Sequence, residues 1–145
     1  MEAHVIKLLD EKFHFFNHER FIEHDPIQIP HQFTRKQDIE IMGFWVATLA
    51  WGQRKTILSK GYELIDLMDG SPFEFIQQHQ ESDLKRFESF KHRTFNATDA
   101  LYFISFFKRH YQQHESLESA FSQQYLAAET TVEQAINRFY LHFFD

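Results

Sequence analysis

The sequence predicts an all-α fold, an orthogonal bundle of about seven or eight helices, in a single domain over residues 1–145. Apolar residues recur at three- and four-residue spacing through most of the chain, which is the period of a helix. Only four Gly and three Pro occur, so the chain has few breaks for hairpins. Capping signals precede several of the periodic stretches.

The chain is expected to begin with a helix over residues 3–17, because apolar side chains fall on one side of it and charged side chains on the other. The segment DPIQIP follows. In it Pro26 and Pro30 each disfavour helix for the residue before them. We therefore expect an extended connector at this point.

Two long helices are expected next. Thr34 stands three residues before Gln37, which is the spacing of a capping box, and this predicts a helix over residues 34–51. A third helix is expected over residues 57–68 and should end at Gly70. The two helices and the turn between them form a helix-turn-helix pair.

Short helices are expected in the middle of the chain. Ser71 supplies a cap, Pro72 suits a first helical position, and Glu74 completes a second capping box. These signals predict a helix over residues 73–79. Another short helix is expected to begin within residues 82–83, where Ser and Asp favour a helix start.

The segment FKHRTFN has no clean period and is expected to be irregular. The helical period returns over residues 97–114, with Asn96 or Thr98 as the cap. Ser116 is expected to open a further helix.

The last expected helix spans residues 131–144 and is opened by a capping box of Thr130 with Glu133. Its aromatic side chains continue to Phe144 with no capping residue behind them. We therefore expect the chain to be the N-terminal portion of a longer protein. The missing C-terminal part of that protein is an expected partner.

Composition excludes several classes of protein. The chain has no Cys, so a disulfide framework and a thiolate metal site are excluded and a cytoplasmic setting is favoured. The N-terminus lacks a basic start followed by an apolar run, so no signal peptide is expected. The most apolar run, residues 41–51, is about half of the roughly 20 residues that cross a bilayer, so no membrane partner is expected.

Charge is distributed unevenly along the chain. The formal net charge is −6, yet residues 34–61 carry five basic and two acidic residues, and residues 85–109 carry six basic and two acidic residues. These segments could form a basic face for phosphates. The alternative is that the charges lie on ordinary solvated helix faces.

Histidine spacing permits a metal site without establishing one. His14 with His18, and His110 with His114, have the i, i+4 spacing that places two rings on one side of a helix. The ligands that would complete a zincin motif are absent, so no metal is expected. We interpret His110 and His114 as imidazoles at the solvent-exposed end of a packed helix face.

The sequence offers no motif for catalysis. Its four glycines are nine residues apart and make no phosphate-binding loop. It contains no G-x-S-x-G elbow and no Cys nucleophile. We therefore expect no catalytic residue and no cofactor in this chain.

Two stretches carry a resemblance to a known family. DPIQIPHQFTRKQDIEIMGFWVATLAWGQRKTILSKG and FKHRTFNATDALYFISFFKRHY resemble the bacterial domain-of-unknown-function 2400 family, over nearly all of the chain. Members of that family are longer than this chain. The family is in turn distantly similar to the helix-hairpin-helix DNA glycosylases, which share a helix, a Gln-containing turn, a second helix and a short helix opened by Pro. The resemblance implies the fold of the glycosylase helical domain.

The same resemblance implies a set of nucleic-acid-binding residues. Gln53 in WGQRKT matches the turn from which glycosylases push a Gln into the duplex as a base is flipped out. Arg54 and Lys55 would then lie near phosphates, and the second basic segment adds Lys91 and Arg93 as candidates. The alternative is that Gln53 only ends a helix.

Three hypotheses for function follow. The first is that the chain is the N-terminal helical part of a glycosylase-like protein that binds DNA. The second is a non-enzymatic helical interaction module, which could form a homo-oligomer through apolar surface. The third is a metal-binding or ligand-binding helical protein centred on the His pairs.

Overall fold

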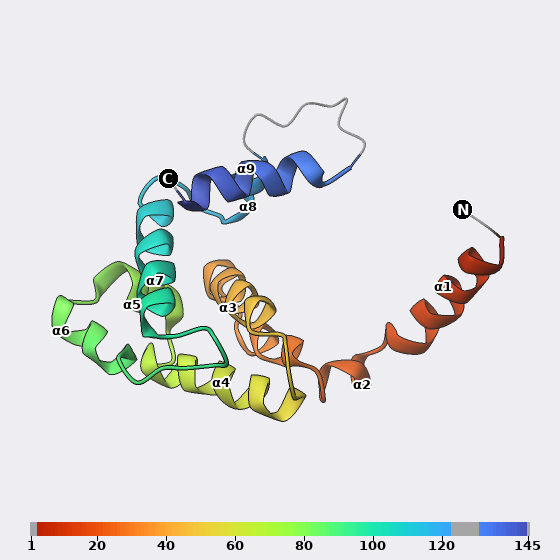
Figure 1. Cartoon of the computed structure of the whole chain (residues 1–145), viewed down its shortest axis with the longest axis horizontal. Coiled ribbons are helices and arrows are strands. Elements are labelled where there is room, and N and C mark those ends of the chain that lie inside the picture. The colour runs from red at the N-terminus through yellow and green to blue at the C-terminus, as the bar shows by residue number, and fades with distance from the viewer. Residues whose placement is uncertain (1–2, 123–130, 145) are drawn as a thin grey trace.

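The computed structural model describes residues 3–122 and 131–144. These residues form nine α-helices and three short 3-10 helices with no β-strand among them, so the expected all-α class is confirmed (Figure 1). In chain order the elements are α1 (Ala3–Phe16), α2 (Glu19–Ile22), η1 (Pro26–Gln28), η2 (Pro30–Gln32), α3 (Lys36–Thr48), α4 (Arg54–Leu67), α5 (Pro72–Gln78), α6 (Glu81–Leu84), η3 (Lys85–Phe87), α7 (Ala97–Tyr111), α8 (Glu118–Ser122) and α9 (Glu133–Phe144).

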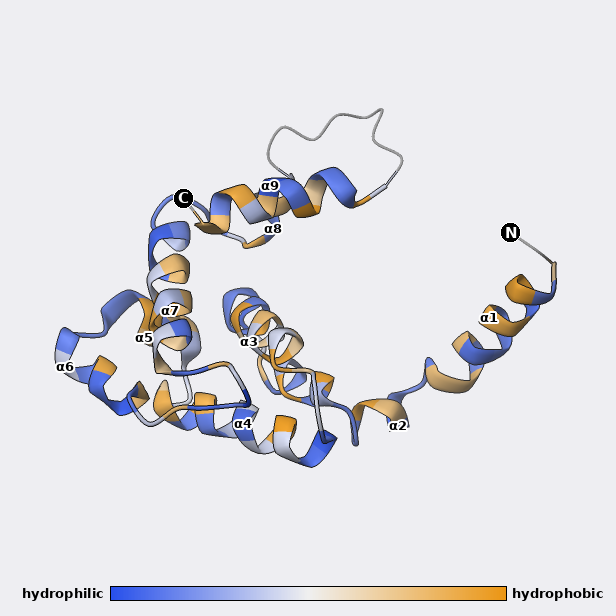
Figure 2. Cartoon of the chain, viewed as in Figure 1, coloured by the Kyte–Doolittle hydropathy of each residue, from blue (hydrophilic) through white to orange (hydrophobic). Residues whose placement is uncertain are grey.

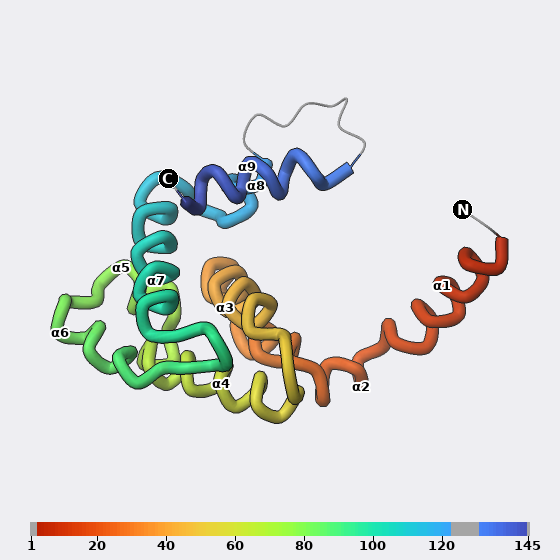
Figure 3. Tube along the Cα trace, in the orientation of Figure 1, coloured from red at the N-terminus to blue at the C-terminus, as the bar shows by residue number. Residues whose placement is uncertain are grey.

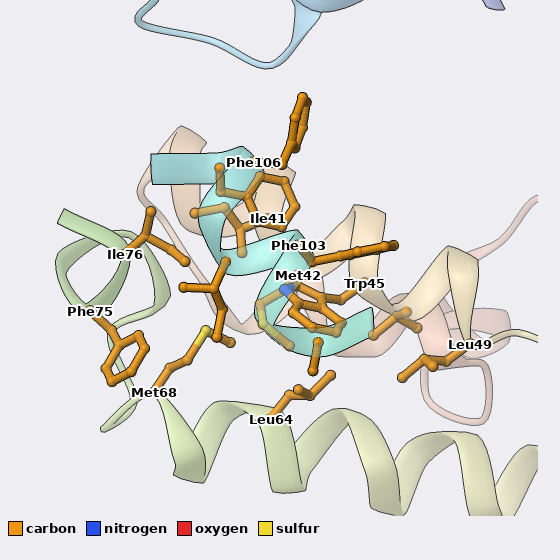
Figure 4. Packing of buried hydrophobic residues seen from close by; sticks show 14 of the residues in the cluster. Ile41, Met42, Trp45, Leu49, Leu64, Met68, Phe75, Ile76, Phe103 and Phe106 are labelled. Atoms are coloured by element: carbon orange, nitrogen blue, oxygen red, sulfur yellow. The ribbon is translucent and has the colours of Figure 1, made fainter. Parts of the chain in front are cut away.

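Helix α3 lies in the middle of the molecule. Helices α4 and α7 run across one another next to it, in the manner of an orthogonal bundle (Figure 3). The buried residues of α3 come from two adjacent stripes, so the helix is covered on most sides. Trp45 lies between Leu64 of α4 and Phe103 of α7 (Figure 4), and its ring centroid is 4.9 Å from that of Phe103.

Aromatic side chains fill the space between α7 and the C-terminal helices. The ring of Phe106 lies 4.6 Å from that of Phe143 between centroids, and Phe121 stacks on Phe139 at 4.4 Å. Rings in such offset or edge-on contacts bury large apolar area in specific geometries. Much of the high Phe content therefore serves packing.

Two of the expected capping boxes are wrong. Helix α3 begins at Lys36 rather than Thr34, and Gln37 donates through Nε2 to the carbonyl oxygen of Glu115 at 2.8 Å. Ser71 and Pro72 do hold the N-cap and first positions of α5. However, the N–H of Phe73 donates to Asp38 Oδ1 at 2.7 Å, and no side-chain cap from Ser71 occurs among the described residues. At α5 a partner from a distant segment therefore replaces the local cap, whereas at α3 the Gln37 side chain binds a distant carbonyl group.

The expected extended connector is also wrong. The segment DPIQIP and the two residues after it form η1 and η2, with Pro26 and Pro30 at their first positions. A Pro fits there because its fixed φ is already helical and its missing N–H would have had no helical partner. Asp25 caps the first turn by accepting from the N–H of Ile27 at 3.0 Å.

Caps later in the chain follow the sequence more closely. Asn96 and Asp99 form a reciprocal capping box at the start of α7, which confirms Asn96 as the cap. The box at α6 is formed by Gln80 with Asp83, so that helix begins before the expected residues. Thr130 lies outside the described residues.

Helix α1 stands apart from the rest of the molecule (Figure 1), and none of its residues is buried. Figure 2 shows apolar and polar residues sharing this helix. Its exposed apolar side chains are Ile6, Leu8, Leu9, Phe13, Phe15 and Phe16. Within the described residues, no helix is both long enough and apolar enough to span a bilayer.

Candidate nucleic-acid interface

The turn between α3 and α4 places Gln53 at the surface. Gly52 has φ +113°, a backbone conformation that a residue with a Cβ rarely adopts, so Gly is needed to turn the chain there. Gln53 is the N-cap residue of α4 through its backbone: its carbonyl oxygen accepts from the N–H groups of Thr56 and Ile57. Its exposed side chain makes no cap within the described part of the chain, and it is free to reach outward.

A second loop, between η3 and α7, ends in a tight two-residue turn. His92 and Phe95 exchange backbone hydrogen bonds of 2.8 and 2.9 Å, with Arg93 and Thr94 between them. Arg93 has φ +56°, in the left-handed region, where a residue other than Gly, Asn or Asp is strained. This conformation sets the direction in which the Arg93 side chain leaves the loop.

These two loops are in contact although they are 41 residues apart in the chain. The ring of His92 donates from Nε2 to the carbonyl oxygen of Trp51 at 3.2 Å. The guanidinium carbon of Arg93 lies 5.6 Å from the centroid of the Trp51 ring, which is cation–π range. Arg93 also packs on Gly52, where an added Cβ would come within 2.6 Å of Nη2.

The five residues expected to bind nucleic acid are all exposed. Arg93 touches the turn that holds Gln53, so the structure brings these two sequence segments together. Arg54 turns toward Asp25, with 3.8 Å between Nη2 and Oδ2. We call the group the Trp51 surface, and it consists of Trp51, Gln53, Arg54, Lys55, Lys91 and Arg93.

Sequence reasoning missed Trp51 as part of this surface. It assigned the residue to the end of the helix expected over residues 34–51, whereas α3 ends at Thr48 and Trp51 is 44% exposed. His92 was missed too, and it is buried beneath Trp51. The available signal was the position of a large aromatic residue directly before the Gly-Gln turn.

A comparison with protein families identifies the chain. The model of a family described as a protein of unknown function, DUF2400, matches residues 25–145. The chain belongs to the DUF2400 family. The Trp51 surface therefore lies within the part that is shared with the family, whereas α1 and α2 precede that part. No curated protein and no solved structure matches this DUF2400 chain.

An apolar cavity of about 760 Å³ opens beside the Trp51 surface of the DUF2400 chain. Its lining includes Pro30, Phe33, Val46 and Ile57, together with Asp25, His31, Gly52 and Arg54. The last two residues belong to the α3–α4 turn or to the start of α4, so the cavity and the surface share an edge. An apolar cavity with a few polar groups at its rim is the usual form of a small-molecule or side-chain pocket.

The two histidine pairs of the DUF2400 chain have surroundings that differ from those suggested by their spacing. No group of three or more His, Cys, Asp or Glu residues is arranged to hold a metal ion in the residues that the structure describes. The helical spacing of His14 and His18 is interrupted, because α1 ends at Phe16. His14 instead contacts the carbonyl oxygen of Asp10 through Nδ1 at 2.8 Å.

The sequence suggested that His110 lies at the solvent-exposed end of a packed face. Instead it is buried between α7, α9 and the segment that leads into α8. Its Nε2 lies 3.0 Å from the carbonyl oxygen of Ser116, so this nitrogen carries the proton, and Nδ1 accepts from His142 Nε2 at 2.9 Å. Burial, and then the nearby rings of His114 and His142, lower the pKa of His110 below the usual histidine value. These contacts link α7 to α9 and to the segment before α8.

Proposed function

We propose that the Trp51 surface binds nucleic acid, and that the chain serves as the nucleic-acid-binding helical part of a DNA-glycosylase-like protein. The observation that carries the proposal is the contact of Arg93 with Trp51, which joins the two basic segments of an otherwise acidic chain. Of the four basic residues assigned to this surface, Arg93 packs on Gly52 and Arg54 is paired with Asp25. Exposed Arg and Lys groups of this kind supply the phosphate contacts that dominate affinity for nucleic acid.

Helix α4 adds a favourable field to the same surface. It is 14 residues long and points its N-terminus at the turn that holds Gln53. The first N–H groups of a helix have no helical partner, and the helix dipole places partial positive charge there. A phosphate near Arg54 and Lys55 would accept from those groups.

Gln53 is proposed to contact bases. The pattern of a helix, a Gln-containing turn, a second helix and a short helix opened by Pro72 resembles that of the helix-hairpin-helix glycosylases, in which the Gln enters the duplex. The exposure of the Gln53 side chain in that turn supports this role. No residue of this chain is proposed to be catalytic.

Salt dependence tests the proposal. We expect the affinity of the chain for a labelled DNA oligonucleotide to fall steeply as salt rises, and the double variant Lys91→Gln, Arg93→Gln to reduce the log–log slope by about 0.9 for each lost phosphate contact. The matched control is Arg109→Gln, which removes an exposed cation near the far end of α7. The proposal would be contradicted if the wild type did not bind DNA. It would also be contradicted if the affinity were independent of salt and the same in the double variant.

The exposed apolar side of α1 favours a second candidate, a helical interaction module. Six large apolar side chains of this helix are exposed, which is more than an isolated surface helix normally presents. Sedimentation of the wild type and of a Leu9→Glu, Phe13→Glu variant would test it. Self-association that the variant abolishes supports this function, and a wild type that sediments as a monomer contradicts homo-oligomer formation.

A further inference from the structure

Trp51 is held in place without being buried. Its ring is perpendicular to the His92 ring, with 6.2 Å between centroids, and Arg93 lies over it. Its carbonyl oxygen is fixed by the His92 hydrogen bond. These contacts order the side chain, yet 44% of the residue is open to solvent. A large aromatic residue that is both positioned and exposed gives up the apolar burial it would gain inside the protein.

The backbone on both sides of this contact is unusual. Gly52 and Arg93 each have a positive φ, and they face one another across the two loops. Arg93 has a Cβ, so its left-handed conformation costs free energy. Strained backbone that orients exposed side chains is a feature of ligand-binding surfaces.

We propose that Trp51 stacks on an unpaired nucleobase, so that the Trp51 surface prefers single-stranded nucleic acid, or a duplex with one displaced base, over an intact duplex. This inference rests on the proposed function and names its substrate class. A base in an intact duplex has both faces covered by its neighbours, so only an unpaired base can offer a face to the indole ring.

The charges around Trp51 suit this ligand. Arg93 lies close enough to the ring to contact both a stacked base and the phosphate next to it. Gln53 is exposed in the turn that follows Trp51, and Lys55 is exposed in the first turn of α4, so they can contact the adjoining base edge and backbone. The set therefore combines a stacking face with cations, which is the arrangement that binds single strands.

The test compares three labelled oligonucleotides of the same sequence: a single strand, its perfect duplex, and a duplex with one central unpaired base. We expect the wild type to bind the single strand and the interrupted duplex more tightly than the perfect duplex. In Trp51→Ala the affinity for those two ligands should fall about 5- to 150-fold, with the perfect duplex little changed. Trp51→Phe, which keeps a ring, should retain part of the preference.

Phe13→Ala is the matched control, because it removes an exposed aromatic residue from α1. It should bind all three oligonucleotides as the wild type does. Circular dichroism of each variant establishes that it is folded. If Trp51→Ala does not fold, the conservative Trp51→Phe variant still decides the test.

The outcomes separate the two proposals. If the wild type binds none of the three oligonucleotides, the proposed function itself is wrong, and this inference is wrong with it. If binding is salt-dependent but equal for single strand and perfect duplex, and Trp51→Ala leaves it unchanged, the surface binds phosphates alone. That result would overturn the stacking role of Trp51 and leave the proposed function standing.

Discussion

The two tryptophans of the chain lie in neighbouring regions and have opposite surroundings. Trp45 has no exposed surface, and its ring contacts those of Phe90, Phe95, Phe103 and Phe107. Trp51 is 44% exposed and contacts His92 and Arg93. The same residue type therefore contributes to folding in one place and is available to a ligand in the other.

Phe95 connects the two regions. Its ring packs on Trp45 at 5.7 Å between centroids, while its backbone pairs with that of His92, which in turn holds Trp51. The core thus fixes the loop that orients the Trp51 surface. Core variants should alter stability first, whereas variants of exposed side chains should alter binding alone.

The largest difference is expected between alanine substitutions at the two tryptophans. Trp45→Ala should lower the free energy of unfolding by about 3–5 kcal/mol, because it removes a large buried ring and leaves a cavity. Trp51→Ala should change it by less than about 1 kcal/mol, because the residue lies at the surface. Urea unfolding followed by circular dichroism measures both, and equal losses would refute the comparison.

A smaller loss is expected from the carboxylate that fastens α3 to the C-terminal helices. Glu40 accepts from Tyr111 Oη and the N–H of Leu117, each at 2.9 Å, and from the Ser116 hydroxyl. Hydrogen bonds to a charged group are worth about 1.5–3 kcal/mol, so Glu40→Ala should lower the free energy of unfolding, measured with urea, by about that much. Glu118→Ala is the control, because its exposed carboxylate makes a surface ion pair with Lys36. If both variants lose the same free energy of unfolding, the hydrogen bonds of Glu40 do not stabilise the fold as expected.

Two glycine variants sharpen the comparison by moving stability in opposite directions. Gly52→Ala should cost about 1–2 kcal/mol, because Ala is strained at φ +113°. Gly43→Ala should gain about 0.5–1 kcal/mol, because it lies inside α3 and an added Cβ would meet only Pro30 Cβ at 3.9 Å. Thermal melts of both variants check the signs, and a stabilised Gly52→Ala would contradict the turn geometry.

The smallest expected effect is a dependence of stability on pH, and it arises from the buried His110. The pKa of His110 is lowered in the folded chain, mainly by burial, so the unfolded chain takes up this proton more readily. Protonation at Nδ1 would also oppose the N–H of His142. Stability should therefore be fully present above pH of about 6.5 and decline as the pH falls below that value.

Thermal melts between about pH 8 and pH 5 measure this decline. His110→Gln should show a shallower decline than the wild type, whereas the control His14→Gln, on exposed α1, should leave it unchanged. An identical profile in His110→Gln would mean that this histidine does not couple pH to folding.

Sequence reasoning located most helices because apolar spacing and a cap such as Asn96 are local features. It failed where a partner came from far along the chain. Asp38 caps the helix that Ser71 was expected to cap, and the carbonyl oxygen of Glu115 accepts a hydrogen bond from the Gln37 side chain. The link between Trp51 and Arg93 is likewise a tertiary contact, so the sequence could propose the cations but not the aromatic residue beside them.

The most direct test of the central claim is a fluorescence titration of the chain with a single-stranded oligonucleotide at about 50 and about 200 mM salt. Trp51 is exposed and Trp45 is buried, so stacking should quench the fluorescence of Trp51 alone. We expect saturable quenching that shifts to higher oligonucleotide concentration at the higher salt and is lost in Trp51→Phe. Fluorescence that does not change on titration, or that changes equally in Trp51→Phe, would contradict the account.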